Sequence, residues 1–411
     1  MAKIKQNIIQ QTKNQNNYLY PDTYHDKIPV HQLPSELNLQ HKKDHLDTYA
    51  SSVSIVDTQT VTVQKYNSDI NSLRNIAGEI VGGRIADCGK KIVASKNTVD
   101  IVNYSKSYYY SGLEHCGSVW VCPVCNYKIS KYRAEQIHNT VSNIRAGCGS
   151  VGMMVLTAPH HRWTNLQDSL DVVINSWRKV KSGRKFIELK QKYNYIGDIR
   201  VLQTTWGKNG WHNHLHILLS AYCDEIELEA FAGKLFELWQ DKVQKADFKR
   251  PNKQGYKFTV VYDEHGISNY ICTGGIADEM TNVRRAKDGN RTPFEILQDI
   301  KDNKGNTEQD IRLFREYATF FKGKKQLTWS KGMKNDYCDL KDKKDEQIVK
   351  DETRGNIVLS LSKNVFKSIV KADIRVDVLN EFALNGIKGV LKLLKAHGIK
   401  FKYKPKQKLI L

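Results

Sequence analysis

Three histidines alternate along one short segment, Trp211-His212-Asn213-His214-Leu215-His216. Successive side chains of a β-strand point to opposite faces, so His212, His214 and His216 share one face and Leu215 lies on the other. Clustered imidazoles pack poorly and are costly to charge, whereas a neutral imidazole is a common metal ligand. The pattern therefore favours a metal site over an ordinary core or surface role.

The chain just before this segment predicts a further ligand. Asn209-Gly210 is a strong hairpin signal, and if these two residues form the turn, Gln203 faces His216 on the histidine face. We expect a divalent ion held by His214, His216 and the side-chain oxygen of Gln203. Two nitrogens and one oxygen with open positions are typical of a catalytic site.

Tyr270 is the candidate nucleophile, because it follows an expected strand and lies near the start of an expected helix. A tyrosine can attack a phosphodiester that a metal ion polarises as a Lewis acid. The chain has 20 tyrosines, so ordinary packing stays open as the alternative. Glu264, just before that helix, is a candidate for activating a water, and a plain loop carboxylate is its alternative.

A second group of residues suited to metal binding consists of cysteines. Cys122-Pro-Val-Cys125 presents two thiolates to one ion, Cys116 lies six residues earlier, and Cys88 precedes a glycine. These four predict a closed structural Zn²⁺ site, with His115 as an alternative to Cys88. No βαβ pattern surrounds the motif, which argues against a redox role.

The composition restricts the class of protein. The chain has 411 residues, and 64 Lys+Arg against 44 Asp+Glu give 64 − 44 = +20. Such a surface attracts polyanions, nucleic acid first, although a lysine-rich solvated surface is the plainer explanation. No apolar run approaches the roughly 18 residues that cross a bilayer, and no apolar stretch follows the basic start. We expect a cytoplasmic protein without membrane contact.

The periodicity of the middle of the chain predicts an α+β fold in which helices pack on an antiparallel sheet. The expected elements are a strand at 151–156, a helix from 166 to 180 capped by Thr164 or Asn165, the histidine hairpin, a helix at 228–239, a strand at 257–262 and a helix from 266. The expected domains are a flexible polar and basic arm (1–75), a cysteine module (76–148), a sheet domain (149–290) and a basic, mainly helical C-terminal region (291–411).

Six segments in this order resemble the rolling-circle plasmid replication initiators of the HUH endonuclease superfamily. They are SGLEHCGSVWVCPVCNYKISKYRAEQI, VLTAPHH, NGWHNHLHILL, NYICTGGIADEMT, GNRTPFEIL and LTWSKGMK. The ordered set is far more specific than the histidine pair alone. The resemblance implies a palm-like HUH nickase domain, preceded by the zinc-binding module and followed by the helical C-terminal region. In VLTAPHH, residues Thr157, His160 and His161 have either a supporting or a direct role.

The resemblance also implies an activity. In that family His214 and His216 correspond to the ligands of Mg²⁺ or Mn²⁺, and Tyr270 to the tyrosine that becomes linked to the 5′ end of origin DNA. The implied partners are origin DNA, single-stranded or in a hairpin, and host replication proteins. Because no second tyrosine lies one turn later, the last step needs another subunit of a homo-oligomer or an activated water.

Departures from the family pattern keep two alternatives open. Thr273 stands where the family usually has a lysine, Gln203 where it often has a glutamate, and Gly274-Gly275 weaken the expected helix. A catalytically decayed, zinc-containing DNA-binding protein is one alternative. An HUH transposase or relaxase with the same fold is the other.

Overall fold

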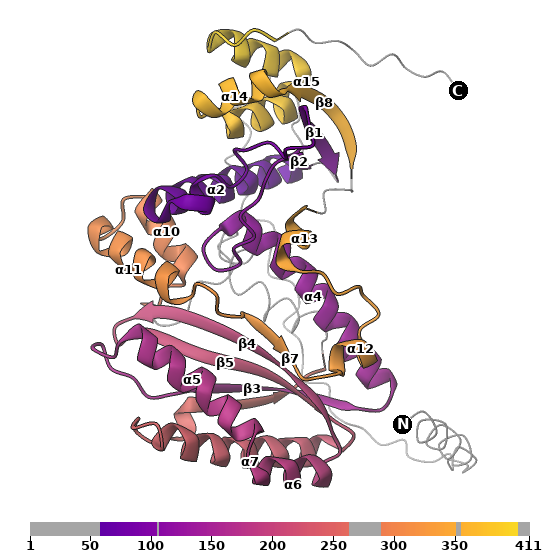
Figure 1. The fold of residues 1–411 in the computed structure, drawn as a ribbon, viewed down its shortest axis with the longest axis vertical. Coiled ribbons are helices and arrows are strands. Elements are labelled where there is room, and N and C mark those ends of the chain that lie inside the picture. Colours follow the sequence, from indigo (N-terminus) through magenta and orange to yellow (C-terminus); the bar gives the residue numbers. More distant parts are fainter. Residues whose placement is uncertain (1–57, 105–106, 263–288, 351–354, 402–411) are drawn as a thin grey trace, which may run out of the picture. The chain divides into compact units, whose positions relative to one another are not determined.

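The computed structural model describes residues 58–401 except 105–106, 263–288 and 351–354. Its larger sheet has five antiparallel strands in the order β6-β3-β5-β4-β7 (Figure 1). They are β3 (Ser150–Thr157), β4 (Tyr195–Gly207), β5 (Gly210–Ala221), β6 (Tyr256–Val260) and β7 (Leu327–Trp329). The histidines lie on the central strand, β5. The expected mixed α and β architecture on antiparallel strands is confirmed at this level.

Two amphipathic helices, α5 (Leu166–Lys181) and α7 (Glu225–Gln244), cover one face of this sheet (Figure 1). The α5 cap is Asn165, whose side chain accepts a hydrogen bond from the Gln167 backbone N–H, and a capping box at Asp224 begins α7. The alternation of β5 sends every second side chain into this layer, namely Leu215, Ile217 and Leu219.

The opposite face carries the histidines and packs against α4 (Pro123–Ala146) and α12 (Met333–Tyr337). Leu218 of β5 and Val201 of β4 belong to the same apolar cluster as Ile137 of α4. Leu218 lies farther from the β4–β5 turn than the three histidines, and Val201 pairs with His216, the histidine farthest from the turn. The helices therefore cover one end of this face, and the histidines occupy the end near the turn.

A second, three-stranded sheet joins segments from both ends of the described chain. Its order is β2-β1-β8, with β1 (Thr98–Tyr104), β2 (Ser107–Ser111) and β8 (Asn356–Ser362). Two helices, α14 (Lys363–Lys371) and α15 (Arg375–Ala396), share its apolar core. The expected cysteine module and C-terminal region are therefore interleaved, and the latter contains strands as well as helices.

The helix α2 (Thr58–Val81) begins inside the segment expected to be a flexible arm. Ile70, Leu73 and Ala77 form a buried stripe at helical spacing, which explains why this part of the arm is folded. The remaining helices are α3 (Gly83–Ala86), α6 (Arg184–Lys192), η1 (Lys253–Gly255), α10 (Pro293–Lys301), α11 (Thr307–Phe320) and α13 (Asp345–Lys350). Within the described residues no helix has the length and apolarity to cross a membrane.

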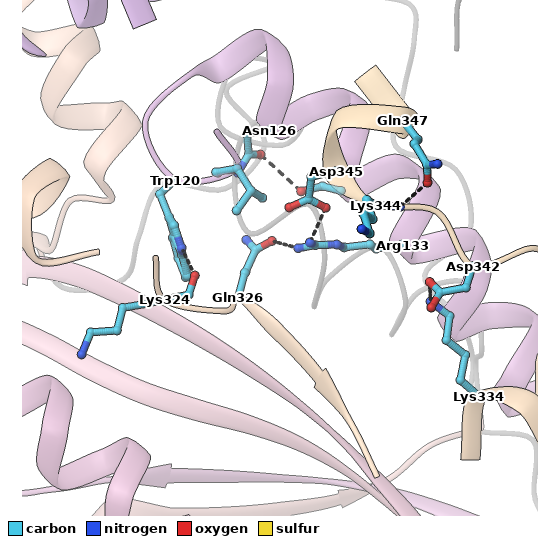
Figure 2. A network of polar contacts seen from close by, with 12 residues as sticks. Trp120, Asn126, Arg133, Lys324, Gln326, Lys334, Asp342, Lys344, Asp345 and Gln347 are labelled. Carbon is cyan, nitrogen blue, oxygen red and sulfur yellow. Dashed lines mark hydrogen bonds and ion pairs between the residues drawn. The ribbon is translucent and has the colours of Figure 1, made fainter. Parts of the chain in front are cut away.

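Polar contacts hold the C-terminal connection against α4 (Figure 2). The Arg133 guanidinium donates to Gln326 Oε1 at 3.0 Å and to the Asp345 carboxylate at 2.6 Å. The Trp120 indole N–H donates to the Lys324 carbonyl at 2.7 Å. The segment before β7 and the start of α13 are thereby tied to the helix that packs on the histidine face.

Candidate functional site on the histidine strand and the cysteine cluster

The three histidines form a row on β5, as the alternation predicts. The ring centroids of His212 and His214 are 5.2 Å apart, and those of His214 and His216 are 4.9 Å apart. His216 is 2% exposed, and the other two are partly buried. The row thus runs from the turn of the hairpin into the sheet.

Burial keeps these imidazoles neutral. It lowers the pKa of His216 to about 4, and burial together with the neighbouring His160 lowers the pKa of His212 to about 4. Burial and the adjacent imidazoles hold the pKa of His214 well below its ordinary value. A neutral imidazole offers a lone pair to a metal ion, so the electronic state of the row suits a ligand set.

Gln203 lies on the histidine face, but opposite a different histidine from the one expected. It pairs with His214 in the β4–β5 ladder, and its Oε1 is 3.3 Å from His214 Nε2. Val201, not Gln203, is opposite His216. The predicted proximity of Gln203 to the row is confirmed, and the predicted register is wrong by two residues.

The turn explains this difference. Gly207 pairs with Gly210, which leaves Lys208 and Asn209 at the tip. Gly210 has a φ of +85°, whereas Asn209 does not have a positive φ. A type I′ turn centred on Asn209-Gly210 needs positive φ at both positions, but a type I turn followed by one left-handed glycine does not. Because the shift is two residues, each side chain keeps its face of the sheet.

His160 brings a fourth imidazole to the row. Its ring centroid is 5.0 Å from that of His212, and burial lowers its pKa. Thr157, the last residue of β3, pairs directly with His214. His161 is exposed instead, with its backbone N–H donating to Thr164 Oγ1 at 2.9 Å. The sequence predicts a role for the VLTAPHH motif. Which of its two histidines lies beside the row depends on the path of the backbone after β3.

Several residues named from the sequence, together with the helix expected from 266, lie outside the described part of the chain. The described backbone ends at Tyr262 before this gap and resumes at Gly289. Tyr270, Glu264 and Thr273 fall between these positions. Their roles stay predictions.

The four predicted cysteines converge on one point. Cys88 Sγ lies 3.6 Å from Cys122 Sγ and 3.7 Å from Cys125 Sγ, and Cys116 Sγ lies 3.6 Å from Cys125 Sγ. All four are buried, and their sulfurs lie within 4.8 Å of one another. Tetrahedral zinc with Zn–S bonds of about 2.3 Å separates its sulfurs by about 3.8 Å. The cluster can therefore hold a metal such as zinc.

Three separate segments supply these ligands. Cys122 occupies the N-cap position of α4 and Cys125 lies in its first turn, whereas Cys88 follows α3. His115, the alternative fourth ligand, lies beside the set, with Nδ1 3.8 Å from Cys88 Sγ. Burial raises the pKa of Cys122, because a buried negative charge is unfavourable. A bound cation would offset the negative charge of thiolates at this position.

The chain is similar to two proteins from Streptomyces. It is 24% identical over 286 residues to a protein named Protein rep from Streptomyces lividans, which covers 54% of this chain and 63% of that protein. It is 25% identical over 133 residues to a Neomycin resistance protein from Streptomyces cyanogenus, which covers 26% of this chain and 30% of that protein. The chain thus spans less than two thirds of each relative. No family model and no solved structure matches it.

Proposed function

We propose that this protein initiates rolling-circle replication of a plasmid by nicking and rejoining single-stranded or hairpin origin DNA. One observation carries the proposal: neutral His214 and His216 lie side by side on a sheet face with the Gln203 amide oxygen 3.3 Å from His214 Nε2. The similarity to Protein rep and the net charge of +20 support DNA as the substrate.

In this proposal His214, His216 and Gln203 hold Mg²⁺ or Mn²⁺, which when bound supplies Lewis-acid polarisation of the scissile phosphate. The Tyr270 oxygen attacks phosphorus, so a phosphotyrosine bond forms while the bond to the 3′ oxygen breaks. The phenol proton passes to solvent and the released 3′ oxygen takes up a proton. A later attack by a 3′ hydroxyl on the phosphotyrosine rejoins a strand.

The cysteine cluster has a structural part in this proposal. Zn²⁺ bound by Cys88, Cys116, Cys122 and Cys125 fixes the first turn of α4. The far part of α4 packs on the histidine face through Ile137. The ion would thus maintain the sheet surface without touching DNA.

Formation of a covalent adduct tests the proposed function. The protein is incubated with labelled single-stranded DNA from its own replicon and Mn²⁺, then resolved on a denaturing gel. We expect an adduct that is lost with chelator, in Tyr270→Phe and in His214→Ala. Tyr262→Phe and His397→Ala are matched controls, because both side chains are exposed and lie outside the site.

The outcomes separate the proposal from its main alternative. An adduct that survives Tyr270→Phe means that another tyrosine is the nucleophile. Tight DNA binding with bound zinc but no adduct would establish a catalytically decayed DNA-binding protein. Thr273, which replaces the lysine usual in the resembled family, is the observation that favours this second candidate.

A further inference from the structure

A cavity of about 670 Å³ lies on the sheet face opposite the histidines, at the β4–β7 edge. Trp177 lines it from α5, Arg200 from β4, and Lys325 from the loop before β7. Arg200 alternates with Val201, whose side chain faces α4, so Arg200 points toward α5. No role in the proposed histidine chemistry involves this cavity.

The cavity is strongly basic. Five cations line it, and two of them are paired: Lys181 with the Asp198 carboxylate, and Lys324 with Asp171 at 3.1 Å. In Figure 2 the Lys324 side chain points away from its carbonyl contact with Trp120. The unpaired cations, which contact no carboxylate among the described residues, are Arg178, Arg200 and Lys325.

Buried donors add to this charge. Arg200 Nη2 donates to Thr328 Oγ1 at 2.7 Å and to the Lys325 carbonyl at 3.3 Å. Arg200 Nε and Trp177 Nε1 are buried and have no hydrogen-bond partner within the described structure. Burial lowers the pKa of Arg200, and the nearby Asp198 carboxylate acts in the opposite direction. A ligand with several acceptor oxygens and negative charge would complement the cations that line the cavity.

We propose that this cavity binds a phosphodiester group of the single strand that the histidine site processes, an inference that rests on the proposed function. Arg200 and Gln203 are three residues apart on β4, about 10 Å along the strand. They project to opposite faces near the edge strand β7, so one DNA strand passing around this edge can reach both sites.

Strand affinity measured across a salt series tests the proposal. Fluorescence anisotropy follows a labelled single-stranded oligonucleotide with the wild type, Arg200→Met, and the double variant Arg178→Ala/Lys325→Ala. Both residues of the double variant are exposed, so it should fold; its melting curve and zinc content verify this. Lys179→Ala is the matched control, an exposed neighbour on α5 that does not line the cavity.

We expect the double variant to bind about 5- to 20-fold more weakly, with a log–log salt slope smaller by about 1.4, because single-strand binding releases about 0.7 counterion per phosphate contact. Arg200→Met should also weaken binding, and Lys179→Ala should stay within about twofold of wild type. Unchanged affinity and slope in a folded double variant would overturn the proposal. Displacement of the strand by a deoxynucleoside triphosphate in wild type, but not in the double variant, would reassign the cavity to free nucleotide.

The experiments can refute either proposal without refuting the other. A wild-type protein that forms the adduct while the cavity variants bind DNA normally would refute only the cavity. A protein that forms no adduct but loses strand affinity in the cavity variants would refute only the nicking chemistry.

Discussion

The proposed metal site can be tested at Gln203 by a substitution that exchanges its amide nitrogen for an oxygen. Its Oε1 is 3.3 Å from His214 Nε2, and an amide oxygen is a weaker ligand for a divalent ion than a carboxylate. We predict that Gln203→Glu lowers the Kd for Mn²⁺ by about tenfold, or about 1.4 kcal/mol, in isothermal titration calorimetry.

Thr205→Glu is the control for this prediction, because Thr205 lies on the same face, two residues nearer the turn, and pairs with His212. The two variants add the same charge to the same surface. If both tighten Mn²⁺ binding equally, the added charge acts through its field, and Gln203 does not coordinate the ion.

At the scale of elements, α4 connects the cysteine cluster to the histidine sheet. Cys122 occupies the N-cap position of the helix, and Ile137 lies in the apolar cluster that contains Val201 and Leu218. We predict that Cys122→Ser releases zinc and lowers the free energy of unfolding by roughly 4 kcal/mol or more, because a structural metal site contributes directly to folding. Zinc content and denaturant unfolding measure this.

The exposed Cys148 supplies the control for the cysteine experiment. Cys148→Ser should change stability by less than about 0.5 kcal/mol and leave zinc content unchanged. Retention of a full equivalent of zinc by Cys122→Ser would show that the cluster is not the binding site.

At the scale of the whole described chain, distant segments are held together by a few buried contacts. Arg375 at the start of α15 is 3% exposed and donates to the Gly89 carbonyl at 2.8 Å and to Asn75 Oδ1 at 2.8 Å. It therefore links the C-terminal helices to α2 and to the turn after Cys88. We predict that Arg375→Met costs about 2 kcal/mol in denaturant unfolding, because the buried Gly89 carbonyl loses its guanidinium donor and the partly buried Asn75 amide oxygen keeps only Arg74 at 3.4 Å.

Lys371→Met is the comparison for Arg375, since Lys371 is exposed at the end of α14. It should shift stability by less than about 0.5 kcal/mol. Equal effects of the two substitutions would mean that Arg375 contributes no more to the free energy of unfolding than an exposed lysine does.

Features that depend on neighbouring residues were predictable. Strand alternation predicted the histidine face, Asn165 was one of the two caps expected for α5, and Cys122 and Cys125 were expected in the cluster that could hold a metal. Each follows from backbone geometry over a few residues, where a period of two or a helical cap needs no distant partner.

Features that depend on how the chain returns to itself were decided by tertiary packing. The turn backbone selected His214 as the partner of Gln203, and the path out of β3 brought His160 beside His212. Convergence of three segments decided between Cys88 and His115, the two candidates for the fourth ligand, and β1 paired with β8 from far along the chain. The spacing of residues along the sequence does not predict these contacts, because the free energy that stabilises them comes from burial and from hydrogen bonds that form only after the segments meet.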